Sequence, residues 1–172
     1  MESIIHPSKI DAEKQSYGDW KTTQTLFGLL VISVVLYGCE VWDNSTSDLQ
    51  WQQIEKIQKR LIINKFKIKS SVPYDIMLSE VGAAPIEAIA MVRLIRYLKK
   101  IEQMEDNRWP KVVFNDILCK IKKTWMRKNN KWLHKWDIHL STCPTNSKEI
   151  KVFVIDKFHK QIWGKGIGRK KK

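Results

Sequence analysis

The acidic residues of this chain do not form the carboxylate cluster that a two-metal catalytic centre requires. Enzymes of that kind hold two magnesium ions between clustered carboxylates and the substrate phosphates. Glu105 and Asp106 are the one pair of adjacent acidic residues, and they lie at the expected end of a helix beside Arg108. The sequence also has no glycine-rich phosphate loop, no Gly-x-Ser-x-Gly turn and no His-Glu-x-x-His helix. We therefore expect a chain that has no catalytic centre and binds no cofactor.

A second group of residues could bind zinc. Cys119, His139 and Cys143 could supply three ligands, and His134 a fourth. Structural zinc sites usually include a close pair of cysteines, which this set lacks, so we predict no metal site. Cys119 is expected to be a small core residue, and Cys143 is expected to be exposed in a turn before Pro144. Three unpaired cysteines without a signal peptide indicate an intracellular protein, in the nucleus or the cytoplasm.

Positive charge is concentrated in the last third of the chain, although the formal net charge of the whole is +13. Residues 1–106 hold 13 Lys and Arg against 14 Asp and Glu, whereas residues 107–172 hold 18 against 4. Cations clustered in this way attract polyanions, because each phosphate contact releases counterions. The expected partner is RNA or DNA, bound largely independently of sequence, and no small-molecule substrate is expected. A solvated, self-repelling surface is the alternative.

Basic and aromatic residues alternate between residues 120 and 136. Indole rings can stack on unpaired bases while neighbouring cations follow the phosphate chain. Trp132 and Trp136, four residues apart on an expected helix, are either stacking rings of this kind or buried anchors of the core. The residues predicted to contact nucleic acid are Lys56, Lys59, Arg60, Arg96, Lys99, Lys100, Lys120, Lys122, Lys123, Trp125, Arg127, Lys128 and Lys131.

Hydrophobic periodicity and capping residues predict an all-α fold, an irregular helical bundle with a disordered basic tail at the carboxyl end. Ser47 with Gln50 has the spacing of a capping box, Gly82 is expected to close a short helix, and Ser147 is expected to cap the last helix. The third long helix is expected to bury a stripe that begins at Val113. The expected helices cover residues 26–37, 47–66, 74–80, 85–104, 110–125, 132–136 and 147–162.

An uncharged run of 18 residues covers positions 22–39. Its length is near the lower limit for crossing about 30 Å of hydrocarbon. The first four residues are polar, however, and the charged Glu40 comes directly after the run. We therefore predict a buried helix over Leu26–Tyr37. The alternative is a membrane-associated protein with one short anchor at about 22–39 and a basic soluble domain that faces anionic lipid.

A short signature closes this run: Leu36-Tyr37-Gly38-Cys39-Glu40-Val41-Trp42. A helix rich in Gln, Lys and Arg comes next at Ile54 to Phe66, and then the segment Leu78 to Pro85, with an acidic residue, a glycine and a proline in that order. This ordered set resembles the reverse transcriptases of non-LTR (LINE-type) retrotransposons, in the region on the carboxyl side of the polymerase active site. The resemblance covers Leu26 to Trp109, roughly half of the chain.

In that family this region comprises the thumb and the adjoining carboxyl-terminal segment, which hold primer and template without performing chemistry. The family's catalytic aromatic-x-Asp-Asp turn has no counterpart here. The resemblance therefore implies a non-catalytic remnant of an RNA-directed DNA polymerase, from a truncated reading frame. The expected division is a loose lead-in at 1–20, a thumb-like helical region at 21–109, a basic Trp-rich helical region at 110–163 and a disordered Lys- and Arg-rich tail at 164–172.

Overall fold

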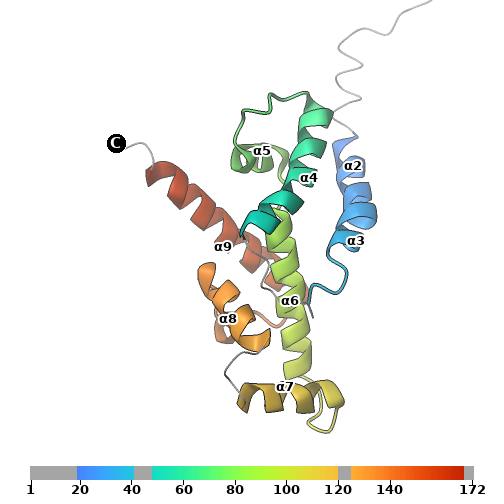
Figure 1. The fold of residues 1–172 in the computed structure, drawn as a ribbon, viewed down its shortest axis with the longest axis vertical. Helices are drawn as coiled ribbons and strands as arrows, with labels where there is room; N and C mark the ends of the chain where they lie inside the picture. The colour runs from blue at the N-terminus through green and yellow to red at the C-terminus, as the bar shows by residue number, and fades with distance from the viewer. Residues whose placement is uncertain (1–18, 41–47, 120–124, 169–172) are drawn as a thin grey trace, which may run out of the picture.

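The computed structural model describes residues 19–40, 48–119 and 125–168. In these ranges the protein consists of helices and loops without strands, which confirms the predicted all-α fold. Helix α6, Ile86–Glu102, runs through the middle of the molecule and is crossed by α9, Ser147–Gly168 (Figure 1). The other elements are α2 Trp20–Phe27, the π-helical turn η1 Gly28–Ile32, α3 Ser33–Val35, α4 Asp48–Phe66, α5 Tyr74–Val81, α7 Trp109–Cys119, α8 Trp125–Lys135 and the 3₁₀ turn η2 Leu140–Thr142.

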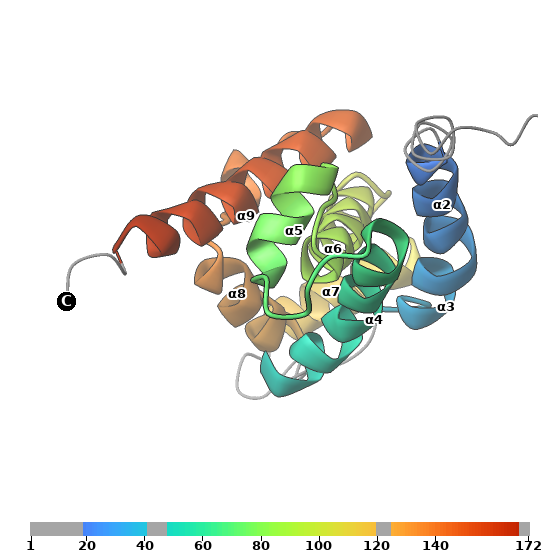
Figure 2. The ribbon, with the colours of Figure 1, turned by 90° about the horizontal axis from the view of Figure 1, so that it is seen from above.

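Helix α6 is buried on nearly all sides because its first ten residues are apolar apart from Glu87 and Arg93. A helix that is apolar all round has to be covered on every face. Helix α9 packs most extensively against it, and α4 and α7 also contact it. Seen from above, α6 lies between α9 on one side and α2 and α3 on the other (Figure 2).

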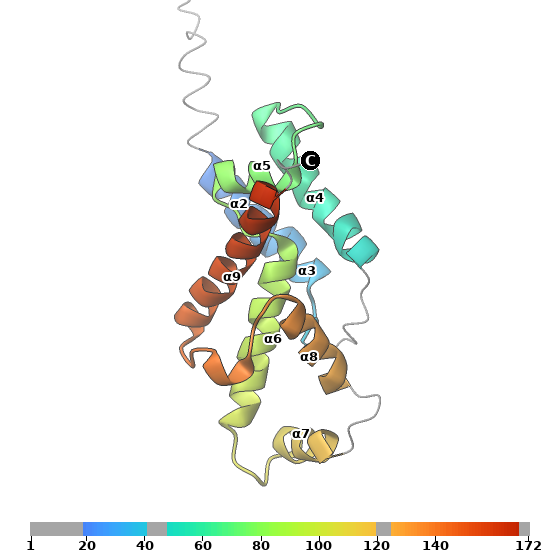
Figure 3. The same ribbon diagram turned by 90° about the vertical axis from the view of Figure 1, so that its left-hand side faces the viewer.

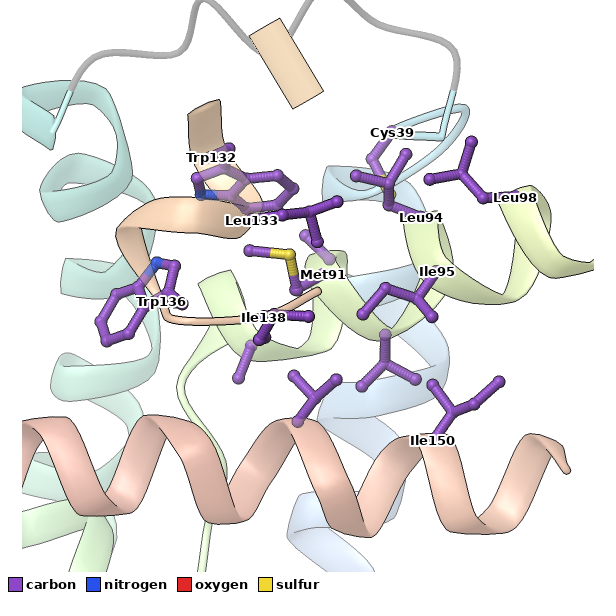
Figure 4. Close-up of a cluster of buried hydrophobic side chains, with 14 of the residues drawn as sticks. Cys39, Met91, Leu94, Ile95, Leu98, Trp132, Leu133, Trp136, Ile138 and Ile150 are labelled. Carbon is purple, nitrogen blue, oxygen red and sulfur yellow. The ribbon is translucent and has the colours of Figure 1, made fainter. Parts of the chain in front are cut away.

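The main core fills the space between α6, α8 and α9, and it also receives residues from α4, α7 and the end of the apolar segment. Met91 lies between Leu133 and Ile138 in the close-up of this core (Figure 4). Each large apolar side chain buried in this way stabilises the fold by roughly 1.5–3 kcal/mol. Because the core takes residues from both sides of position 109, the predicted thumb-like and Trp-rich regions share it.

A small core of Ile62, Met77, Leu78 and Ala83 joins α4 to α5. These two helices lie side by side at one end of the molecule (Figure 3). Helix α5 ends at Gly82, whose φ of 63° is left-handed and favours glycine. The Ala83 N–H then donates to the Leu78 carbonyl at 3.0 Å, which closes the helix as a Schellman motif. The predicted end of this helix at Gly82 is confirmed.

The prediction of one long helix over residues 110–125 is wrong in register, and residues 120–124 of it lie outside the described ranges. Helix α7 ends at Cys119 and α8 begins at Trp125. Val113, predicted to be buried, is exposed, and its neighbour Phe114 enters the main core instead. A one-residue change of this kind turns a helix by about 100°, which moves the buried stripe to another face.

Helix α9 differs from its prediction at both ends. Asn146 rather than Ser147 caps it, since the Lys148 N–H donates to Asn146 Oδ1 at 3.0 Å. At the other end the helix continues to Gly168, in place of the disordered tail predicted from residue 164. Once a helix is nucleated by packing, each further residue adds one hydrogen bond for the one residue that it fixes. Residues 169–172 of the predicted tail lie outside the described ranges.

The apolar segment, Leu26–Tyr37, is helical as far as Val35 and is buried on one face only. Ile32 and Leu36 lie in the main core, whereas Leu30 and Val34 are exposed. The prediction of a buried helix therefore holds for one face only, because the described part of the chain packs against only one side of this segment. None of the described helices combines the length and the apolar character needed to cross a membrane.

The signature at the end of the apolar segment forms a turn held against α6. Gly38 has a left-handed φ of 67°, and the buried Leu36 and Cys39 flank it. Arg93 Nη1 donates to the Leu36 carbonyl at 3.0 Å, so the turn is fastened to the central helix. Val41 and Trp42 lie outside the described residues.

Candidate nucleic-acid interface

Helix α8 separates its apolar and cationic side chains on two faces. Met126, Trp132, Leu133 and Trp136 are buried in the main core. Their spacing of three and four residues places them along one side of the helix. The predicted site residues on the rest of α8 are the exposed Arg127 and Lys131 and the half-buried Lys128.

Glu87 fixes α8 against α6. Its side chain is buried, and Oε1 accepts hydrogen bonds from the indole Nε1 of Trp132 at 2.8 Å and of Trp136 at 2.9 Å. Lys135 Nζ lies 3.4 Å from the same oxygen. A buried carboxylate needs such partners, because an unpaired buried charge is strongly destabilising. Hydrogen bonds to a charged acceptor therefore join the two helices in addition to apolar packing.

Both indole rings are covered by other aromatic rings. Trp132 stacks on Trp51 of α4, with ring centroids 5.5 Å apart and planes 9° from parallel. Trp136 stacks on Phe158 of α9, with centroids 3.7 Å apart. Their N–H groups and ring faces are thus engaged inside the protein. Of the two roles that the sequence left open, Trp132 and Trp136 have the core role.

Glu55 of α4 lies in the same contact region as Glu87. Burial, together with the negative charge of Glu87 as the next largest cause, raises the pKa of Glu55 from 4.5 to about 7. A hydrogen bond from the Glu87 backbone N–H and the charge of Lys135 offset part of this rise. Glu55 therefore changes its protonation near neutral pH, where α4, α6 and α8 meet.

Deprotonation of Glu55 should make the folded state less stable as the pH rises. Because its pKa is higher in the folded than in the unfolded state, its contribution is complete below about pH 4.5 and is lost as the pH passes about 7. Between pH 5 and pH 8 the wild type should lose roughly 2–3 kcal/mol of unfolding free energy relative to Glu55→Gln. Urea unfolding of both proteins at the two pH values measures this difference. Parallel pH profiles would contradict the raised pKa.

The predicted site residues of α4 lie away from its buried side. Lys56 and Arg60 are exposed and, four residues apart, are neighbours on the helix surface, and Lys59 is half-buried. The opposite side carries Gln58, which is buried and accepts a hydrogen bond from the Tyr74 hydroxyl at 2.6 Å. This contact fixes α4 on α5 and leaves the cations toward solvent.

The predicted site residues of α6 serve mainly the fold. Arg96 donates from Nε and Nη2 to the Ser147 carbonyl, at 3.2 and 2.6 Å, and so holds the start of α9. Lys99 forms an ion pair with Glu102 at 3.0 Å. Lys100 is exposed. Among the predicted residues of this helix, Lys100 is thus the one best placed for an external phosphate.

The remaining predicted residues lie in the connection between α7 and α8. Lys120, Lys122 and Lys123 are outside the described residues, and so is the side chain of Trp125. The exposed cations of the predicted set that the structure does place are therefore on α4, α6 and α8. The Trp51–Trp132 stack brings the first turn of α4 against α8.

Cys39 and Cys143 lie where burial suppresses their reactivity. Cys143 is buried beside η2 and donates from Sγ to the His139 carbonyl at 3.2 Å, so its predicted exposure is wrong. Burial raises the pKa of Cys143, and burial together with the nearby Glu40 charge raises the pKa of Cys39 to about 11. In the described ranges no three potential metal ligands come together. The side chain of Cys119 is outside those ranges.

Sequence reasoning missed the roles of Glu87 and Trp51. A signal for the first was present, because Glu87 is the only charged residue between Val81 and Val92. Buried indole N–H groups also require acceptors, so two tryptophans at helical spacing indicate that a polar partner is needed. No local pattern indicated that Trp51 would stack on Trp132.

Comparison of the chain with protein-family models, curated proteins and solved structures found no match. The charge distribution of the chain and the exposed cations of α4 and α8 are its features on which a functional proposal can be based.

Proposed function

We propose that this protein binds the phosphate backbone of RNA or DNA, largely independently of sequence, and performs no catalysis. The observation that carries the proposal is the surplus of cations in residues 107–172, with 18 Lys and Arg against 4 Asp and Glu. On α8 the side chains of Arg127 and Lys131 are exposed, because the apolar face of this helix is held in the core through Glu87. Lys and Arg contacts to phosphate supply affinity without reading bases.

The proposal includes an origin from the thumb and adjoining region of a LINE-type reverse transcriptase. The ordered signature at residues 36–42, 54–66 and 78–85 supports it. Gly38 and Gly82 in this set both adopt a left-handed φ, which gives a physical reason for glycine at these two places. A protein of this kind acts on polynucleotides inside the cell, in the nucleus or the cytoplasm.

Backbone contacts rather than base stacking are the proposed source of affinity. Trp132 and Trp136 are occupied in the core and offer no faces to unpaired bases. These two rings therefore contribute no stacking on unpaired bases. Duplex and single-stranded ligands of equal length should accordingly bind with affinities that depend on their phosphate density.

Removing two exposed cations from α8 is expected to weaken binding. Arg127→Ala with Lys131→Ala should lower duplex affinity about tenfold at low salt and reduce the salt slope by about 1–2, at roughly 0.9 per phosphate contact. The matched control is Lys21→Ala with Lys69→Ala, which removes the same charge from exposed positions of the first 106 residues. Fluorescence anisotropy measures both. Equal losses in the two variants would mean that net charge alone, and not α8, determines binding.

A further inference from the structure

A groove of about 390 Å³ lies between the apolar segment and helices α6 and α9. Phe27, Gly28 and Ile32 line one side, and Ile89, Val92 and Ile155 line the other. This volume is within the range of small-molecule sites. At about 30 Å³ for each water-sized group, the groove holds roughly a dozen non-hydrogen atoms.

The charged residues that line this groove are all cations. Arg93, Arg96 and Lys151 take part in the lining, which contains no Asp or Glu. Arg93 is fixed by its bond to the Leu36 carbonyl and Arg96 by its bonds to the Ser147 carbonyl. A guanidinium has five N–H donors, so each arginine keeps donors beyond those used in these contacts. Lys151 is exposed on α9.

The wall at Gly28 is open. Apart from its chain neighbours and the backbone of its own helix, no atom lies within 4 Å of the position that a Cβ of Gly28 would take. Gly28 begins the π-helical turn η1, a feature that is frequent at functional sites. Its backbone is in the ordinary right-handed helical region, with φ of −61°, so a larger residue can be accepted there without strain.

We infer that this groove binds a small amphipathic anion, with a carboxylate or phosphate head at Arg93, Arg96 and Lys151 and an apolar chain along the opposite end. Charge complementarity selects the anion, because three cations line the groove and no acidic residue does. The apolar residues of the lining, which also contains Gln24 and Gln58, select a hydrocarbon body in place of a fully polar one. The inference does not rest on the proposed nucleic-acid function, although Arg96 was predicted to take part in both.

Octanoate and octyl phosphate, used below their micelle concentrations, are suitable probes, with 1-octanol and inorganic phosphate as controls. Isothermal titration calorimetry should show one saturable site for at least one of the two octyl anions. Tighter binding of octanoate would identify a carboxylate as the head group of the ligand, and tighter binding of octyl phosphate would identify a phosphate. Octanol and inorganic phosphate should each bind at least about tenfold more weakly, since each lacks one half of the interaction. Inorganic phosphate binding as tightly as the octyl anions would overturn the inference.

Two variants locate the ligand. Gly28→Leu should fill the groove and abolish binding, while its helical preference keeps or raises the thermal midpoint. Lys151→Glu should weaken binding at least about tenfold, whereas Lys148→Glu, an exposed change on the same helix outside the groove lining, should leave it unchanged. Arg127→Ala with Lys131→Ala should also bind the octyl anions like wild type. Undiminished binding by folded Gly28→Leu, or equal effects of the two α9 variants, would place the ligand elsewhere.

Discussion

Replacing Glu87 by alanine is expected to remove much of the stability of the protein. The substitution leaves the indole N–H groups of Trp132 and Trp136 in the core without their acceptor, and Lys135 without its carboxylate. A buried donor without a partner costs about 1–3 kcal/mol, so the total should reach about 3–5 kcal/mol. Domains of this size are stable by only about 5–15 kcal/mol. Urea unfolding monitored by tryptophan fluorescence and circular dichroism measures the loss.

Glu87→Gln is the matched control for this prediction. It keeps a carbonyl oxygen where both indole N–H groups donate, so a loss of only about 1 kcal/mol is expected. Because it removes the negative charge next to Glu55, it should also bring the pKa of Glu55 down from about 7. NMR titration of the Glu55 side chain reads this shift. Equal losses of unfolding free energy in Glu87→Ala and Glu87→Gln would show that Glu87 does not stabilise the fold through its hydrogen bonds with the two indoles.

Leu36→Asp is expected to abolish cooperative unfolding, whereas Val34→Asp is expected to be tolerated. Leu36 is 0% exposed in the main core, and Val34, two residues earlier, is 72% exposed. An unpaired charge at the first position costs several kcal/mol, while a surface change at the second usually stays within about 0.5 kcal/mol. Thermal unfolding monitored by circular dichroism compares the two variants. Unfolding of Val34→Asp with a stable Leu36→Asp would contradict the burial pattern of the apolar segment.

Local signals predicted the helices whose ends are determined by local chemistry. The helix after Pro85 and the end at Gly82 result from backbone preferences that hold in any context. Ile150, Val154 and Phe158 of α9 are four residues apart, and all three are buried in the main core. Spacings of four residues repeated over several turns leave few alternatives for the buried face of a helix.

Features that depend on distant contacts could not be predicted. The apolar segment has enough hydrophobic residues for burial on all sides. Which of its faces are covered depends on tertiary packing, and Leu30 and Val34 are exposed in the described chain. The burial of Phe114 in place of Val113 likewise depends on how α7 packs against α6. An acidic residue such as Glu87 is typical of the first turn of any helix. Its role as acceptor is evident only from the tertiary contact with the indoles of Trp132 and Trp136.

The salt dependence of binding to scrambled-sequence duplexes tests the central claim most directly. If about five phosphates are neutralised, the logarithm of the association constant should fall with the logarithm of salt concentration at a slope of about −4 to −5. Affinities for unrelated sequences of equal length should agree within about threefold, because phosphate contacts do not read bases. Fluorescence anisotropy with the full chain, from low to physiological salt, gives both quantities. An affinity that does not change with salt, or that is confined to one sequence, would contradict the account.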